Sequence, residues 1–246
     1  MEELAIRFDA MASHDITYVA SSRPPGPPAC SVPLAYVLTN CHNSLCAVGG
    51  TINEDDHVFG LSAAKKYGGE FVPAHQSVIH SYMRERYARP RQDDPGLRLP
   101  HPLRRLRHHG HRRGRSGAGP AAFIKTYNIP YPKVIAIYLT GTPIPGVGPQ
   151  DVALELIRST FKDGVVKNAV MEFFGPGVAN LSMDYRSGID VMTTETTCLS
   201  SIWPADHTLK AHLAVLGRGE RSSPRPPPMG PTMTDSLRWS WTRSDP

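Results

Sequence analysis

The chain has 246 residues, which is enough for one or two domains with a substantial core. No apolar run reaches the roughly 18 residues that a membrane-spanning helix requires, which argues against an integral membrane protein. The net charge is +5, but residues 91–115 alone contribute +6, from eight arginines and two aspartates. The rest of the chain is close to neutral, which argues against a protein built to bind nucleic acid over its whole surface.

Four elements are predicted in the first half of the chain. Alternating apolar character at Ile16, Tyr18 and Ala20 indicates a strand within Met1–Ala20. The apolar run Leu34–Leu38 predicts a short buried strand. Residues Val58–Tyr67 have helical spacing, and Gly68 and Gly69 follow where glycine commonly ends a helix. A second helix is predicted over Gln76–Tyr87.

A βαβ unit is predicted in the second half. The β-branched run Val134–Leu139 indicates a strand, and Ala169–Phe174 indicates the next one. Between them, Pro149 suits the first turn of a helix, and apolar residues in Val152–Phe161 then line one helix face. A parallel strand pair with a right-handed crossover is therefore expected. Leu209–Leu216 predicts a further short helix.

Proline is concentrated in three stretches without periodic apolar residues. Sixteen of the 24 prolines lie in Pro24–Pro33, Pro90–Pro120 and Pro224–Pro246. Such stretches are poor candidates for a packed core, because proline removes backbone donors and few apolar side chains are available to bury. Disordered linkers are one explanation for them.

The chain opens with Met-Glu-Glu and lacks the basic end and apolar centre of a signal peptide. We therefore expect a reducing, cytoplasmic location, where the four cysteines need not pair. Cys41 and Cys46 are spaced C-x4-C, but no C-x2-C partner occurs in the sequence. We interpret the four cysteines as structural or accidental, with no metal ligand among them.

Two long blocks of the sequence carry a family resemblance. The first contains KKYGGEFVPAHQSVIHSYMRE, and the second, Leu139–Ile202, contains LTGTPIPGVGPQDVALELIRSTFKDGVVKNAVMEFFGPGVANLS. Both resemble the aconitase and isopropylmalate dehydratase superfamily, in its branch of aconitase-like hydratases. The blocks occur in the order that the family has, and together they cover less than half of the chain.

The resemblance implies an α/β fold, present in part, of the three-layer α/β/α type found in the iron–sulfur domains of aconitase. It also predicts how the chain is organised. The predicted regions are 1–90, the first part of such a domain with 22–32 out of frame; 91–122, out of frame and disordered; 123–218, a second aconitase-like region with the βαβ unit; and 219–246, an out-of-frame tail.

Frameshifts would explain why the proline-rich stretches interrupt the resemblance. Residues 91–105, RQDDPGLRLPHPLRR, can be written in codons whose next reading frame gives GKMILGSDSHTRYGA. That text contains the family's Asp-Ser-His-Thr active-site segment, and the bases of Asp-Ser-His would underlie Arg98–His101. We therefore expect frameshifts near Ser21, Pro90 and Gly219, the first two restored further on, and an inactive fragment as the product.

The family's enzymes dehydrate and rehydrate hydroxy-acids, so the resemblance implies a hydro-lyase for a small hydroxy-di- or tricarboxylic acid. A [4Fe–4S] cluster in this family acts as a Lewis acid on the substrate. Its ligands come from a Cys-Thr/Ser-Asn segment and a later C-x2-C, which the resemblance places beyond this chain's end, as it does a swivelling C-terminal domain. A carboxylic-acid substrate is expected, and neither nucleic acid nor membrane is expected as a partner.

The resemblance indicates three catalytic residues. His80 in Val-Ile-His matches an active-site histidine, and Glu195 matches the glutamate of an Asn-x-x-x-Glu segment. His42 falls near an Asp-His pair, although Cys41 stands where the aspartate would be, just as Val191 replaces the asparagine before Glu195. Each also has a structural explanation, because His80 could be a packed core histidine and Glu195 could cap or solvate a turn.

Two other functions stay open. Arg98–Arg115 could be the basic arm of a non-enzymatic nucleic-acid-binding module, which a steep salt dependence of binding would reveal. A single-domain hydratase without a cluster is the other, and an iron assay combined with an activity assay would identify it. Gly175–Gly177 could suggest a phosphate cradle, but a turn that closes the βαβ unit is the interpretation we prefer.

Overall fold

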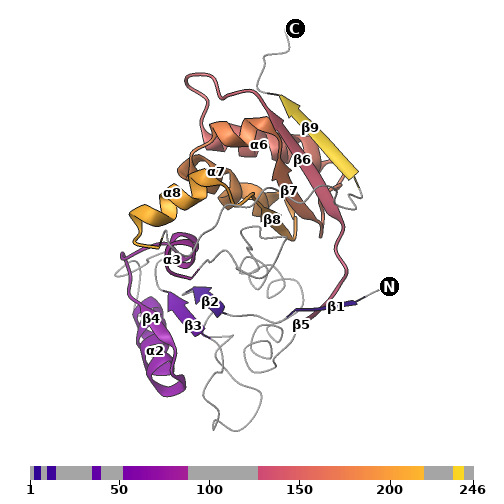
Figure 1. Cartoon of the computed structure of the whole chain (residues 1–246). Coiled ribbons are helices and arrows are strands. Elements are labelled where there is room, and N and C mark those ends of the chain that lie inside the picture. Colours follow the sequence, from indigo (N-terminus) through magenta and orange to yellow (C-terminus); the bar gives the residue numbers. More distant parts are fainter. Residues whose placement is uncertain are drawn as a thin grey trace. The chain divides into compact units, whose positions relative to one another are not determined.

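A computed structural model describes residues 3–6, 10–14, 35–39, 52–87, 127–218 and 235–240 (Figure 1). The chain divides into two units. Unit 1 comprises Met1–Tyr87 with Pro102–Tyr131, and unit 2 comprises Ala88–His101 with Pro132–Pro246. Each unit is described by itself.

Unit 1 contains a parallel sheet of three strands in the order β2-β3-β4. The strands are β2 (Ala10–His14), β3 (Ala35–Thr39) and β4 (Glu70–Val72). An antiparallel pair is formed by β1 (Glu3–Ile6) and β5 (Tyr127–Pro130). Strand β3 confirms the strand predicted at Leu34–Leu38, shifted by one residue. Strands β1 and β2 lie within Met1–Ala20, where a strand is predicted, but Ile16, Tyr18 and Ala20 lie outside the described residues. Strands β4 and β5 were not predicted.

Unit 1 also contains two helices, α2 (Ile52–Tyr67) and α3 (Ile79–Arg86). Helix α2 begins before the predicted start at Val58, and its acidic first turn and basic last turn both suit the helix dipole. The predicted end is confirmed, because Gly68 has a φ of +73° and the N–H of Gly69 donates to the Ala64 carbonyl oxygen at 2.8 Å.

Unit 2 contains a parallel sheet of four strands in the order β8-β7-β6-β9 (Figure 1). The strands are β6 (Val134–Thr140), β7 (Val170–Phe174), β8 (Ser200–Ile202) and β9 (Asp235–Ser240). Strands β6 and β7 pair in parallel, with Val134 opposite Val170, so the predicted βαβ unit is confirmed. Strand β9 pairs in parallel with β6, although it lies in the tail that the sequence analysis assigns to the wrong reading frame.

The helical elements of unit 2 connect these strands. They are α6 (Pro149–Phe161), η2 (Pro176–Asn180), α7 (Met183–Met192), η3 (Thr193–Thr196) and α8 (His207–Val215). Pro149 opens α6 as predicted, and the N–H of Gly148 donates to the Asp151 carboxylate at 2.7 Å. None of the described helices is both long enough and apolar enough to span a membrane.

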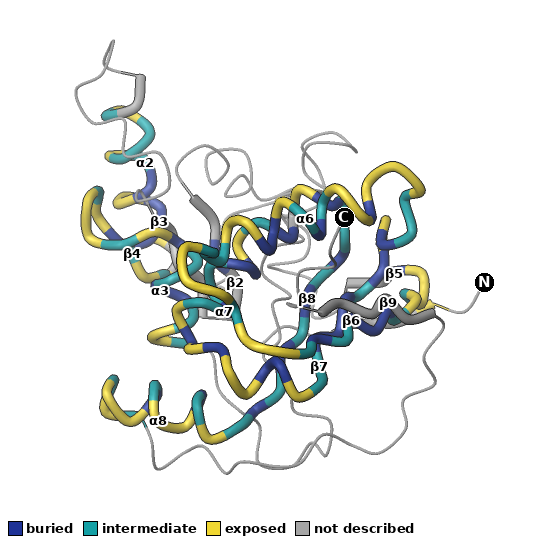
Figure 2. Tube along the Cα trace, turned by 90° about the horizontal axis from the view of Figure 1, so that it is seen from above, coloured by how far each residue is buried: buried dark blue, intermediate teal, exposed yellow. Residues whose placement is uncertain are grey.

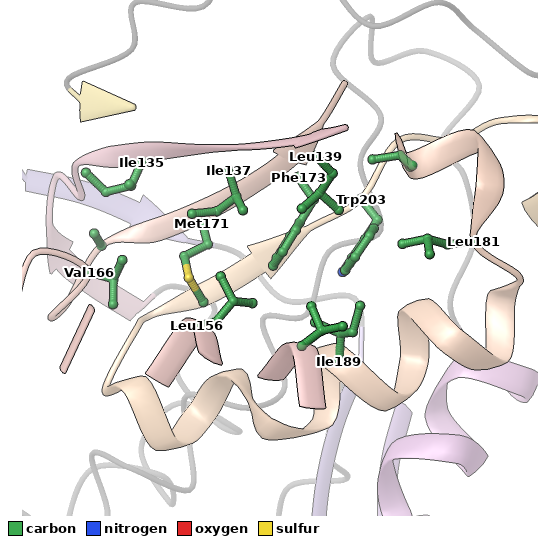
Figure 3. Packing of buried hydrophobic residues seen from close by; sticks show 13 residues of the cluster. Ile135, Ile137, Leu139, Leu156, Val166, Met171, Phe173, Leu181, Ile189 and Trp203 are labelled. Carbon is green, nitrogen blue, oxygen red and sulfur yellow. The ribbon is translucent and has the colours of Figure 1, made fainter. Parts of the chain in front are cut away.

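The core of unit 2 lies between the sheet and its helices. Strand β6 directs Ile135, Ile137 and Leu139 into it, because alternate residues of a strand share one face (Figure 3). The rings of Phe173 and Trp203 stack with centroids 4.0 Å apart and an interplanar angle of 2°. Buried and exposed positions recur along α6 as its amphipathic sequence predicts (Figure 2). The fold is therefore α/β, with an apolar core behind a parallel sheet.

The turn after β7 lies directly against the end of β6. Gly175 has a φ of +103°, and a Cβ atom there would lie 2.5 Å from the Leu139 carbonyl oxygen. A Cβ atom on Gly177 would lie 2.9 Å from the backbone of Leu139 and Thr140. Glycine is required at both positions for close packing, and the sharp turn predicted at Gly175–Gly177 serves that packing.

Candidate active site

The three predicted catalytic residues differ in location and in exposure. Glu195 lies on η3 in unit 2 with an exposed side chain, and His80 lies on α3 in unit 1 with a partly buried one. His42 lies outside the described residues, as do the segments Arg98–His101 and Arg98–Arg115. His80 and Glu195 belong to different units, so the contacts around each are described within its own unit.

A network of buried polar side chains lies beside the turn that carries Glu195. The hydroxyl of Thr193 donates to the Asp190 carbonyl oxygen at 2.8 Å and lies 3.3 Å from the hydroxyl of Ser201. The Ser201 hydroxyl donates to the Asp190 carboxylate. Asp190, Thr193 and Ser201, which we call the Asp190 network, are at most 2% exposed. They connect the end of α7 with η3 and β8.

Hydrogen bonds also hold the C-terminal side of the same turn. The hydroxyl of Thr196 donates to the Thr193 carbonyl oxygen at 2.6 Å, and the thiol of Cys198 donates to the same oxygen at 3.2 Å. Thr197 follows with a φ of +62°, and its carbonyl oxygen accepts from the N–H of Asn168 at 3.1 Å. Glu195 is thus an exposed carboxylate between two threonines whose side chains are buried and hydrogen-bonded.

An ion pair between a buried arginine and a partly exposed aspartate fixes the helix that leads to this turn. Arg186 on α7 is 1% exposed, and its two Nη atoms donate to the Asp206 carboxylate at 3.0 and 2.7 Å. One of them also donates to the Val178 carbonyl oxygen at 2.9 Å. Asp206 is the N-cap of α8 as well, since it accepts from the N–H of Leu209 at 3.1 Å. The pair therefore connects α7 with α8 and η2 through a bidentate geometry.

Sequence reasoning missed these buried polar residues. Asp206 carries a detectable signal, because an aspartate just before a helix is a common N-cap. Arg186, Asp190 and Ser201 carry none, since charged and hydroxyl residues are usually exposed and only the folded chain shows that these are buried.

His80 lies on a helix whose tyrosines contact a carboxylate. The hydroxyls of Tyr82 and Tyr87 both donate to the carboxylate of Glu70 on β4. Burial, together with the nearby Glu70 carboxylate, raises the pKa of Tyr87, so this phenol remains a donor above the pH at which tyrosine ordinarily ionises. Histidine is a common general acid–base group in enzymes, which makes His80 a candidate for that role.

The described residues do not fit a [4Fe–4S] cluster. Cys198 is the cysteine they include, and its thiol donates a hydrogen bond to the Thr193 carbonyl oxygen. Among the described residues no three His, Cys, Asp or Glu side chains converge as metal ligands would. Cys30, Cys41 and Cys46 lie outside the described residues.

Comparison with known proteins relates this region to one family. The sequence profile of the Aconitase family (aconitate hydratase) matches residues 114–226, a range that contains α6, α7 and Glu195. An aconitase–ribosomal protein bL21m fusion protein of Schizosaccharomyces pombe is 30% identical over 174 residues, which is 68% of this chain and 18% of that protein.

Two further relatives match at higher identity over shorter spans. A phosphinomethylmalate isomerase of Streptomyces viridochromogenes is 40% identical over 90 residues, 37% of this chain and 10% of that protein. A mitochondrial homoaconitase of Cryptococcus neoformans is 40% identical over 79 residues, 32% of this chain and 11% of that protein. The matches thus span less than a fifth of each relative's length. On these grounds the chain belongs to the aconitase superfamily.

Proposed function

We propose that the chain is part of a hydro-lyase that interconverts a small hydroxy-di- or tricarboxylic acid and its dehydrated form. The proposal is supported most directly by the position of Glu195. Its carboxylate is exposed on a turn held by hydrogen bonds, within the region that matches the Aconitase family. A relative named as an isomerase of phosphinomethylmalate is consistent with a polycarboxylic substrate. We also propose that the α/β fold is part of a three-layer α/β/α domain of the aconitase type.

The proposed chemistry requires proton transfer at two points. One proton leaves the carbon next to the carboxylate, and another joins the departing hydroxyl group as water forms. Glu195, on a turn that exposes its carboxylate, can exchange one of these protons. His80, and His42 outside the described residues, are the other proposed acid–base groups. A histidine suits this task because its ordinary pKa lies near neutrality.

A [4Fe–4S] cluster, where present, supplies a Lewis acid for the substrate hydroxyl and carboxylate. The described residues do not fit it, so the roles above rest on protein groups alone. We propose that the chain as it is written is inactive, because the Asp-Ser-His segment is encoded out of frame beneath Arg98–His101. This part of the proposal concerns residues outside those that the structure describes.

Resequencing the coding DNA, with about two kilobases beyond the gene, tests the frame hypothesis. We expect single-base shifts near Ser21, Pro90 and Gly219. A DNA record that encodes these prolines and arginines without a shift would overturn it. The corrected reading frame then provides the protein for the activity test.

The activity test measures the ultraviolet absorbance of the unsaturated acid formed from citrate-like hydroxy-acids. We expect turnover by the corrected protein and none by the chain as written. Glu195→Gln should lower kcat of the corrected protein by about 10²- to 10⁴-fold, which is the usual contribution of a general acid–base group. Glu155→Gln, which changes a partly exposed glutamate that pairs with Arg158 on α6, is the control and should leave kcat unchanged. A corrected protein that turns over no hydroxy-acid would rule out the proposed function.

A further inference from the structure

We propose that the Asp190 network positions Glu195, so that Asp190, Thr193 and Ser201 act on catalysis through the turn and without touching substrate. This inference rests on the proposed function, because it assumes that Glu195 is the acid–base group. It assigns three positioning residues from buried contacts alone.

The turn itself offers little rigidity. Element η3 spans four residues, and short 3₁₀ helices have poorer hydrogen-bond geometry than α-helices. The orientation of such a turn therefore depends on what its side chains bind. Thr193 and Thr196, on either side of Glu195, are 2% and 1% exposed, and both hydroxyls are hydrogen-bonded.

The network joins elements that lie apart in the sequence. Asp190 is in the last turn of α7, and Ser201 is in the middle of β8. The Ser201 hydroxyl bridges them, since it donates to the Asp190 carboxylate and lies 3.3 Å from the Thr193 hydroxyl. Strand β8 pairs with β7, with Ser201 opposite Met171, so the bridge connects the turn to the sheet.

Burial makes this bridge hard to replace. Ser201 is 0% exposed and Asp190 is 1% exposed, so water has little access to either group when its partner is removed. A buried polar group without a partner is costly, and the surrounding structure moves to satisfy it. Loss of the Ser201 hydroxyl should therefore displace η3, and with it the carboxylate of Glu195.

The test compares three variants of the full chain. Ser201→Ala removes the bridging hydroxyl. Asp190→Asn keeps an oxygen acceptor in a side chain of nearly the same shape and is the conservative substitution. Thr160→Val is the matched control, because Thr160 is also 0% exposed and its hydroxyl donates to the Leu156 carbonyl oxygen at 2.6 Å, within α6.

The first readout is the ¹³C carboxyl resonance of Glu195 in chain labelled with ¹³C-glutamate, assigned with Glu195→Gln. We expect a single sharp resonance in the parent, Asp190→Asn and Thr160→Val chains. In Ser201→Ala we expect the resonance to shift or broaden as the turn samples several positions. A change of equal size in Thr160→Val, or no change in Ser201→Ala, would overturn the inference.

The second readout separates this inference from the proposed function. In the corrected, active protein, Ser201→Ala should lower kcat by about 10- to 100-fold, as loss of a supporting hydrogen bond does elsewhere, while KM changes by less than about twofold. If the corrected protein is inactive, the proposed function fails and the resonance alone decides whether the network orders Glu195. If kcat is unchanged while Glu195→Gln is impaired, the positioning role fails and the proposed function stands.

Discussion

The two units of this chain differ in how their cores are assembled. In unit 2, one cluster of 13 buried apolar residues comes from Ile135–Trp203, a continuous part of the described chain. Among the described residues of unit 1, the corresponding cluster has five members, drawn from β2, β4 and α3. Among the described residues, unit 2 therefore joins apolar residues of many elements into one core, whereas the cluster in unit 1 is small and takes four of its five members from Val72–Met83.

The largest expected effect comes from the core of unit 2. Phe173→Ala removes a ring that is 1% exposed and stacked on Trp203, so we expect a loss of about 3–5 kcal/mol in the free energy of unfolding. Phe161→Ala removes a phenyl ring from a position that is 59% exposed, and should change the free energy of unfolding by less than about 0.5 kcal/mol. Urea denaturation followed by tryptophan fluorescence measures both, because all three tryptophans lie in unit 2. Equal losses would show that Phe173 is not in a core.

The ion pair between Arg186 and Asp206 should give the next largest effect. Asp206→Asn leaves the Arg186 guanidinium, which is 1% exposed, without its counter-charge. We expect a loss of about 1.5–3 kcal/mol in the free energy of unfolding, the range for a hydrogen bond to a charged group. Glu155→Gln, which breaks the exposed pair between Arg158 and Glu155, should barely move the urea midpoint. A small effect of Asp206→Asn would mean that Arg186 finds another partner.

The turn after β7 should be more sensitive than a glycine of similar φ elsewhere. Gly175→Ala places a Cβ atom 2.5 Å from the Leu139 carbonyl oxygen, whereas nothing lies within 4 Å of a Cβ atom on Gly146. Their φ angles are +103° and +90°, so the comparison isolates crowding from backbone strain. Gly175→Ala should cost about 1–3 kcal/mol more in unfolding free energy, the usual range for overpacking. Paired urea titrations measure the difference, and equal costs would argue against close packing on β6.

The smallest expected effect lies in unit 1 and depends on pH. Because the pKa of Tyr87 is raised above its ordinary value of 10.0, mainly by burial and then by Glu70, its neutral form is favoured in the folded chain. Its contribution to stability is complete below pH 10 and is lost as the pH rises through the folded-state value. Tyr87→Phe should remove the part of the alkaline loss of stability that comes from ionisation of Tyr87. Circular dichroism between about pH 9 and 12 measures it, since these values bracket the ordinary pKa of tyrosine. Tryptophan fluorescence, which reports on unit 2, should not show this pH-dependent change.

The elements that the sequence predicted are those with a regular apolar pattern. Strands β6 and β7 and helix α6 bury alternate or helically spaced apolar residues, so periodicity alone indicates them. Helix α7 was missed because Arg186 and Asp190 occupy two of its buried positions and interrupt that pattern. Strand β8 has three residues, which is too short for a pattern to show.

The candidate site could be predicted only in part for a similar reason. Glu195 was identified by its place in a family motif, which a sequence preserves. The contacts beside it depend on the crossover that brings Ser201 next to Asp190, 11 positions earlier in the chain. No local rule connects a serine in a strand with an aspartate at the end of the preceding helix. The candidate residue could therefore be proposed from the sequence, but the contacts beside it could not be predicted.

The sheet order has a consequence for how the chain emerges during synthesis. Strand β6 pairs with β7, made soon after it, and with β9, made about 100 residues later. Until the ribosome has released Asp235–Ser240, one side of β6 keeps unpaired backbone groups that other nascent chains can bind. Translation that pauses before that point would therefore favour aggregation of a chain whose βαβ unit is already complete.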